Sequence, residues 1–321
     1  MKKIAAILLV AIMLVSLASC SGAGRTTALK LTTGGVSGTY YPYGGAMAQI
    51  FSSKMNNVKV TANTSGASAE NIRLVGKGSK NDGADLGIVQ NDVMAYAYEG
   101  VEQFSEGKID TFRTIATLYP EYIQIVVAKD SGINSIADMK GKRISVGDAG
   151  SGVEANAKQI LEAYGLTFDD INASHLSFKE SGQALQDKQL DGFFCTAGIP
   201  NAAIQEVAHQ RPIKILSIDD DKAKQLKEKY PFYVQVTIPK DVYNTEEDAN
   251  TLAVMATLIC NKDLSEDLVY NLTKTLFENQ AELAEAHAKG AELSLEKAVE
   301  GVSVPFHPGA EKYFREKGVL K

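Results

Sequence analysis

A strand, a polar loop and a helix follow one another repeatedly through the chain after residue 27. The residue pattern predicts strands at 28–33, 58–63 and 85–89, with a helix at 43–53 after the first strand. Strands that alternate with helices in this way form a parallel sheet with right-handed crossovers. Ligands of such sheets bind beyond the carboxyl ends of the strands, and here those ends run into polar, glycine-rich loops.

A second α/β unit begins near Tyr119, with expected strands at 123–128 and 192–196 and a helix at 153–164. The chain is expected to pass between the two units twice, which permits hinge closure. We therefore predict an α/β fold made of two lobes, a central ligand cleft and two hinge crossings. The crossings are expected near Pro120–Gln124 and Tyr233–Ile238, lobe I at 29–119 and 238–321, and lobe II at 120–237.

The last part of the chain, from Glu246 onward, is predicted to be mostly helical. It contains the apolar run Thr251–Cys260, which is too short to cross a membrane. We expect this run to form a buried helix.

The N-terminus has the pattern of a secretory signal: Lys2 and Lys3, an apolar run at 4–15, then small residues. The segment Leu17-Ala18-Ser19-Cys20 resembles the lipobox of bacterial lipoproteins, whose cysteine is acylated. The alternative is an ordinary secretory signal with an incidental cysteine. We expect a signal peptide at 1–19, a lipidated tether at 20–28, and a folded part held at the outer face of the cell membrane through Cys20.

Charge and reactive side chains exclude several functions. The formal net charge is -6 and no basic run follows the N-terminus, so a nucleic-acid partner is not expected. The four histidines are scattered, without the spacing of a metal site, and no glycine-rich segment fits a phosphate or dinucleotide loop. Cys195 and Cys260 are expected to be free buried thiols. We predict no catalysis, no cofactor and no metal.

The polar loops supply the candidate binding residues. Glycines between a strand and a helix let backbone N–H groups face inward, and the helix N-terminus attracts negative charge. Side chains that we expect at this edge are Ser37, Thr39, Tyr40, Ser65, Ser68, Gln90, Asp92, Ser151 and Thr196. Most of them have a structural alternative: the hydroxyls and Asp92 could cap helices, and Tyr40 could pack at a helix start.

Several motifs, in order along the chain, resemble the TAXI family of solute receptors for tripartite ATP-independent periplasmic (TRAP) transporters. They lie at Thr33–Pro42, Ser65–Leu74, Ala84–Asp92, Gly150–Glu154, Ala197–Pro200, Tyr230–Tyr233 and His307–Tyr313. The resemblance covers essentially the whole chain after the expected signal peptide.

This resemblance implies a type II periplasmic-binding-protein fold and a ligand that is a small acid or an amino acid, glutamate-like in some members. It also implies a fused TRAP permease as the membrane partner. By position, lobe I would contribute Ser37, Thr39, Tyr40, Ser65, Asn71, Gln90 and Asp92 to the pocket, and lobe II or the hinge would contribute Ser151, Thr196, Gly198 and Tyr233. No arginine lies in these loops, so helix N-termini and hydroxyls would have to hold an anionic ligand. A ligand sensor and an enzyme on the same fold are the alternatives.

Overall fold

The computed structural model describes residues 26–321, so the expected signal peptide and Cys20 lie outside the described residues. Ten strands form one hydrogen-bonded sheet in the order β2-β1-β3-β10-β4-β7-β5-β6, with β8 beside β4 and β9 beside β10. The strands are β1 (Thr27–Thr32), β2 (Val58–Asn63), β3 (Leu86–Gln90), β4 (Phe112–Ala128), β5 (Arg143–Ser145), β6 (Asn172–Ser174), β7 (Gly192–Ala197), β8 (Ile213–Leu216), β9 (Val234–Ile238) and β10 (Ala249–Asn261).

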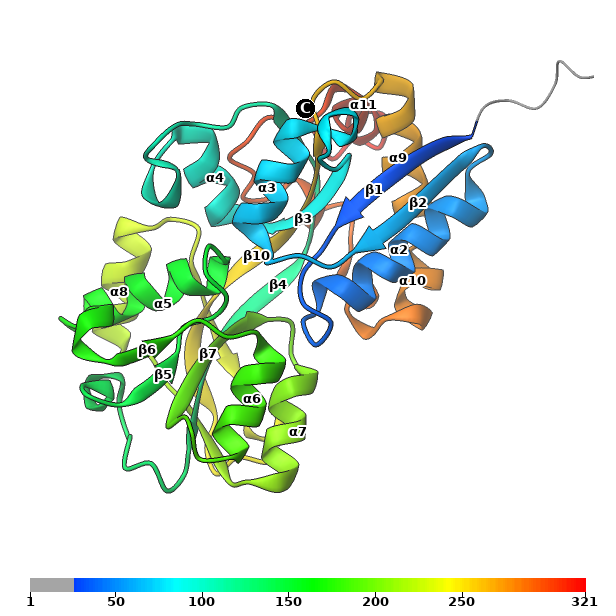
Figure 1. Cartoon of the computed structure of the whole chain (residues 1–321). Coiled ribbons are helices and arrows are strands. Elements are labelled where there is room, and N and C mark those ends of the chain that lie inside the picture. Colours follow the sequence, from blue (N-terminus) through cyan, green and yellow to red (C-terminus); the bar gives the residue numbers. More distant parts are fainter. Residues whose placement is uncertain (1–25) are drawn as a thin grey trace, which may run out of the picture.

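Helices cover the sheet of each lobe (Figure 1). In lobe I they are α2 (Tyr40–Lys54), α3 (Ser68–Lys77), α4 (Asn91–Glu99), α9 (Glu266–Glu278), α10 (Gln280–Ala286) and α11 (Pro308–Glu316). In lobe II they are α5 (Gly152–Ala163), α6 (Phe178–Gln186), α7 (Ala202–Gln210) and α8 (Asp220–Lys229). No helix in residues 26–321 is long and apolar enough to cross a membrane.

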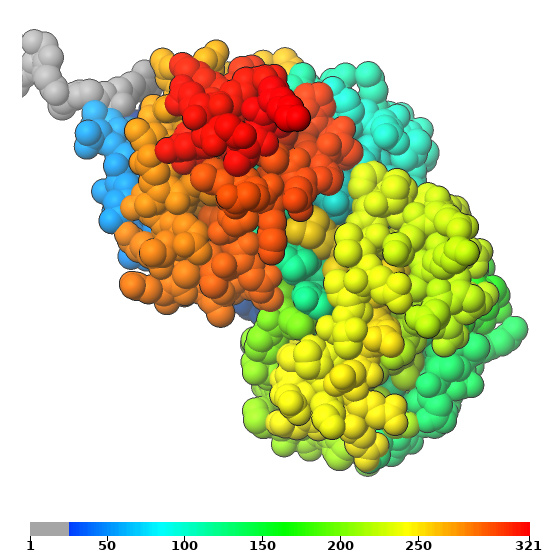
Figure 2. All heavy atoms as spheres, turned by 180° about the vertical axis from the view of Figure 1, so that it is seen from behind, coloured from blue at the N-terminus to red at the C-terminus, as the bar shows by residue number. Residues whose placement is uncertain are grey.

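The two long strands β4 and β10 join the lobes. Phe112 to Tyr122 of β4 pairs with β10, and Tyr122 to Val127 pairs with β7. The end of β10 pairs with β3, whereas its beginning pairs with β9. Two antiparallel strands therefore run through the waist that separates the two masses in Figure 2.

The expected crossings fall on different features. Pro120–Gln124 lies within β4, where the pairing changes from β10 to β7. Tyr233–Ile238 falls mostly on β9, whose residues pair along Ala249–Ala253 of β10. The second strand that passes between the lobes is thus β10 itself.

The expectation of a buried helix at Thr251–Cys260 was wrong, because this run forms most of β10. The strand has neighbours on both edges and is buried on both faces. A strand buried in this way is a continuous apolar run, which periodicity alone does not distinguish from a buried helix. The helices expected farther along the chain are present as α9, α10 and α11.

The lobes share packed apolar residues on one side of the waist. Val93 and Met94 of α4 belong to the same buried cluster as Ile160 and Leu161 of α5. Since α4 follows a lobe I strand and α5 follows a lobe II strand, the structure is a closed arrangement of the two lobes.

Candidate ligand-binding site

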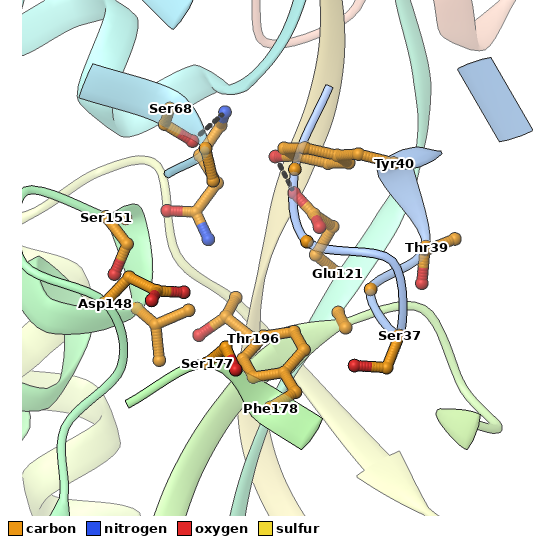
Figure 3. A pocket seen from close by; sticks show the side chains of 18 residues that line it. Ser37, Thr39, Tyr40, Ser68, Glu121, Asp148, Ser151, Ser177, Phe178 and Thr196 are labelled. Carbon is orange, nitrogen blue, oxygen red and sulfur yellow. Dashed lines mark hydrogen bonds between the residues drawn. The ribbon is translucent and has the colours of Figure 1, made fainter. Parts of the chain in front are cut away.

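A cavity lies between the lobes, at the carboxyl ends of the strands (Figure 3). The space among its lining atoms, counted together with its opening to solvent, is about 530 Å³. The residues that line it are Gly34, Gly35, Ser37, Gly38, Thr39, Tyr40, Ala67, Ser68, Gln90 and Glu121 from lobe I and the start of the crossing, and Asp148, Ser151, Gly152, Val153, Ser177, Phe178, Thr196 and Ala197 from lobe II.

Four helices begin at this cavity: α2, α3, α5 and α6. Their first N–H groups lack partners within the helix and carry partial positive charge. Ser151 caps α5 by accepting a hydrogen bond from the N–H of Glu154 at 3.1 Å, and Ser177 caps α6 through the N–H of Glu180 at 3.3 Å. For Ser151 the capping alternative therefore holds, and the residue also lines the cavity.

Thr39 does not cap its helix with its side chain. Its Oγ1 instead accepts a hydrogen bond from the backbone N–H of Gly198, at 3.2 Å. Nearby, Asn201 Nδ2 donates to the carbonyl of Ser37 at 3.2 Å. Both bonds join the first loop of lobe I to the loop after β7, so they form only when the lobes are closed.

Glu121 is a buried carboxyl in the middle of β4, where only 2% of the residue is exposed. Tyr40 Oη donates a hydrogen bond to Glu121 Oε2 at 2.6 Å (Figure 3). Burial raises the pKa of Glu121 to about 8, although the bond from Tyr40 acts in the opposite direction. Burial likewise raises the pKa of Tyr40, so its hydroxyl keeps its proton and acts as a donor.

Asp148, in the loop between β5 and α5, is the second acidic group at the cavity. Burial and the nearby carboxylate of Glu180 raise the pKa of Asp148. The residues that line the cavity include no lysine, arginine or histidine. The site therefore combines two carboxyl groups with the positive ends of the helices.

Gln90 ends β3 at the cavity, and 2% of the residue is exposed. Its backbone N–H donates to Ser68 Oγ at 3.1 Å. Its side-chain Oε1 is buried and has no hydrogen-bond partner within residues 26–321. A buried amide oxygen without a partner costs free energy, which a bound ligand or a bound water can offset.

Six of the eleven residues predicted to bind ligand line the cavity: Ser37, Thr39, Tyr40, Gln90, Ser151 and Thr196. The structure places the other five, Ser65, Asn71, Asp92, Gly198 and Tyr233, outside the lining. Gly198 lies directly behind it through its bond to Thr39.

Asn71 and Ser65 hold the loops of lobe I together. Asn71 Oδ1 accepts hydrogen bonds from Thr32 Oγ1 at 2.7 Å and Ser65 Oγ at 2.6 Å. Its Nδ2 donates to the carbonyls of Thr33, at 2.5 Å, and Ile88, at 2.7 Å. The amide thus connects β1, β3 and the loop before α3, and it has no capacity left for a ligand.

Asp92 and Tyr233 belong to a buried polar network between α4 and α5. Asn156 of α5 donates to Asp92 Oδ2 at 2.9 Å and lies 3.0 Å from Tyr233 Oη. Tyr233 Oη in turn donates to Gln159 Oε1 at 2.5 Å. Burial raises the pKa of Asp92 to about 6. Asp92 therefore joins the lobes, whereas Tyr233 supports α5 within lobe II, and neither residue lines the cavity.

A model of the NMT1-like family matches residues 31–318. The chain belongs to the NMT1-like family. Two solved structures similar to it are the periplasmic aliphatic sulphonate binding protein SsuA from Escherichia coli and the alkanesulfonate-binding protein SsuA from Xanthomonas axonopodis pv. citri bound to MOPS. The first has a TM-score of 0.50 at 14% identity, covering 92% of this chain and 79% of that one. The second has 0.51 at 15%, covering 91% and 85%. These likenesses confirm the predicted two-lobed periplasmic-binding-protein fold.

The sequence did not lead us to expect Glu121, Asp148, Ser177 and Phe178 in the lining of the cavity. For Glu121 a signal was present: it is a lone carboxylate inside the apolar run that forms β4. Asp148 follows β5 in the glycine-rich loop before α5. From this loop we expected only Ser151 to contribute a side chain to the binding site. Nothing local marks Ser177 and Phe178, because their role depends on where α6 begins in space.

The expectation of two free thiols is confirmed, since Cys195 and Cys260 are both buried and unpaired. Burial raises the pKa of both thiols, which keeps them protonated and unreactive. Within residues 26–321, no three His, Cys, Asp or Glu side chains are grouped to hold a metal ion.

Proposed function

We propose that this protein is an extracytoplasmic solute receptor that closes its two lobes around a small polar metabolite and delivers it to a membrane transporter. The observation that carries the proposal is the cavity itself, which is lined from both lobes and closed by hydrogen bonds between them. A cavity built in this way changes when the lobes separate, as hinge closure around a ligand requires.

The hinge of this receptor lies within β4 and β10. We place lobe I at residues 29–119 and 256–321 and lobe II at 120–255, because β9 and the beginning of β10 pair with each other and β8 lies beside β4. Closure then needs only small rotations spread along two strands.

The membrane partner in this proposal is a permease of the TRAP type, and the tether is a lipid on Cys20. The motif-by-motif similarity to the TAXI family supports the first, and the lipobox-like segment supports the second. The proposal includes no catalytic step. Its ligand is a small metabolite such as an amino acid, a dicarboxylate or a keto acid.

Thermal unfolding in the presence of candidate ligands tests this function. A ligand at about 100 times its Kd stabilises the folded state by about 2.7 kcal/mol, which a thermal-shift panel detects readily. Small-angle scattering of the protein bound to that ligand should give a smaller radius of gyration than scattering of the empty protein. If no small acid or amino acid stabilises the protein, the receptor function is wrong.

A further inference from the structure

The ionisable side chains that line the cavity include two carboxyls and no basic group. The carboxyls are Glu121 and Asp148, and neither makes a salt bridge within residues 26–321. Behind the lining, the side chain of Lys289 lies beside Gly198. Lys289 Nζ is already paired with Glu292 at 2.5 Å.

Glu121 needs a partner for its carboxyl more than Asp148 does, because Glu121 is more deeply buried. A buried carboxylate is costly unless it is paired and hydrogen-bonded. Tyr40 provides the one side-chain hydrogen bond that Glu121 receives among the described residues. Its raised pKa reflects the same shortage of partners. A positive group placed in the cavity would supply the missing partner.

Other groups at the cavity can bind the negative end of a ligand. The helices α2, α3, α5 and α6 direct their positive N-terminal ends to the cavity, and the hydroxyls of Ser37, Ser68 and Thr196 lie on its wall. The cavity thus offers donors on its loops and a carboxyl on its strand. A molecule with one negative end and one positive end complements both.

We propose that the ligand carries a protonated amine that pairs with Glu121, and that its acidic group lies at the helix N-termini. This proposal rests on the receptor function argued above and narrows it: zwitterions of the amino-acid type bind, whereas keto acids and dicarboxylates without an amine do not. An anion without an amine would leave Glu121 without a cationic partner, and its negative charge would oppose ionisation of that carboxyl.

Matched pairs of ligands test the proposal on the wild-type protein. The probes are the proteinogenic amino acids, the 2-oxo acids that correspond to them, and succinate, each measured by thermal shift and by isothermal titration calorimetry. We expect at least one amino acid to bind, and its 2-oxo counterpart to bind at least about 30-fold more weakly, a difference of about 2 kcal/mol.

Glu121→Gln then assigns the discrimination to one side chain, since glutamine has nearly the same shape without the charge. We expect Glu121→Gln to lower the affinity for the amino acid by at least about 30-fold. The affinity for the 2-oxo acid, where it is measurable, should stay unchanged or improve. Glu206→Gln is the matched control, because Glu206 is exposed on α7 and outside the lining. It should bind like the wild type.

The outcomes separate the two proposals. Binding of a 2-oxo acid or succinate as tightly as any amino acid would overturn the amine assignment and leave the receptor function standing. So would an unchanged preference for the amino acid in Glu121→Gln. A wild-type protein that binds none of the probes contradicts both. The comparison of ligands on the wild type needs no variant, so it remains decisive if Glu121→Gln folds poorly.

Discussion

Asn156 donates a hydrogen bond to Asp92 across the boundary between the lobes, at 2.9 Å. The two residues lie on α5 and α4, and Asn156 also accepts a bond from Thr196 at the cavity wall, at 3.0 Å. One amide therefore links the cavity to the contact that holds the lobes together. Closure and ligand binding depend on the same side chain.

Asn156→Ala should weaken ligand binding without removing a cavity-lining residue. In the closed form the change removes one hydrogen bond from each of Asp92, Tyr233 and Thr196, at about 1–3 kcal/mol for each atom that stays unsatisfied. Since the open form can hydrate these groups, we expect Kd to rise about 10-fold or more. Calorimetry measures the affinity and small-angle scattering the degree of closure. Ser181→Ala is the control, because the Ser181–Ser145 bond joins only α6 and β5.

The part of the empty protein's stability that depends on Asp92 and Glu121 should fall as pH rises from about 4 to about 8. Burial raises the pKa of Asp92 to about 6 and of Glu121 to about 8, so the folded state holds these protons at pH values where the unfolded chain releases them. Each unit of pKa difference corresponds to about 1.4 kcal/mol. The titratable groups that face Glu121 are Tyr40, Tyr119, Asp92 and Cys195.

Chemical denaturation of wild type and Glu121→Gln at pH 5, 6.5 and 8 measures this effect. The variant should be the more stable protein at pH 8, and the difference should shrink toward pH 5. A difference that does not change with pH would show that Glu121 is not a buried titrating group.

Alanine substitution at Asn71 should mainly lower the stability of the protein, whereas alanine substitution at Gln90 should mainly lower its ligand affinity. Asn71→Ala removes four hydrogen bonds that connect β1, β3 and the loop before α3, so we expect a loss of about 2–4 kcal/mol in the free energy of unfolding. Gln90→Ala removes no side-chain bond that the structure contains, so the empty protein should keep its Tm while ligand affinity falls. Urea denaturation and calorimetry on both variants check this. A large stability loss in Gln90→Ala would assign it a structural role.

The parts of the fold that sequence predicted well are those with alternating elements. The strand at Val58–Asn63 and the helix that follows residue 152 are found within a residue of their expected ends. Each is bounded by glycine or polar residues, and Gly165 ends the helix with a φ of 72° that favours glycine. Strand β10 was mistaken for a helix because its run is apolar throughout.

The sequence predicted which loops form the site, but it did not predict which side chains of those loops face the cavity. Loops at the carboxyl ends of parallel strands meet, which brought Ser37, Thr39, Gln90 and Thr196 to one cavity. Which polar side chain faces the cavity depends on packing: Asn71 turns inward to satisfy two backbone carbonyls. Glu121 entered the site because β4 crosses the waist, a consequence of tertiary structure.

Cys20→Ser should prevent lipid attachment. If the lipobox-like segment is processed as in lipoproteins, the thiol of Cys20 is the acylated group, and serine cannot replace it. We expect labelling by a radioactive fatty acid to be lost and the protein to be unprocessed or released from the membrane fraction. Cys260→Ser serves as the control for labelling, since Cys260 is buried in the fold. Persistent labelling of Cys20→Ser would refute the anchor.

Gly152→Ala should hinder closure through a single methyl group. A Cβ at position 152, the first residue of α5, would lie 1.7 Å from Gln90 Oε1 of the opposite lobe, so the buried Gln90 amide would have to shift for the lobes to close as they do. The empty protein can stay open and avoid the clash, and its Tm should change little. Ligand affinity should fall by at least about 10-fold, because the closed form now carries strain of about 1–3 kcal/mol. Gly45→Ala, where a Cβ meets no atom within 4 Å, is the control and should bind normally. Equal affinity in both variants would mean that Gly152 and Gln90 do not meet in the ligand-bound protein, and that the lobes close on the ligand in a different arrangement.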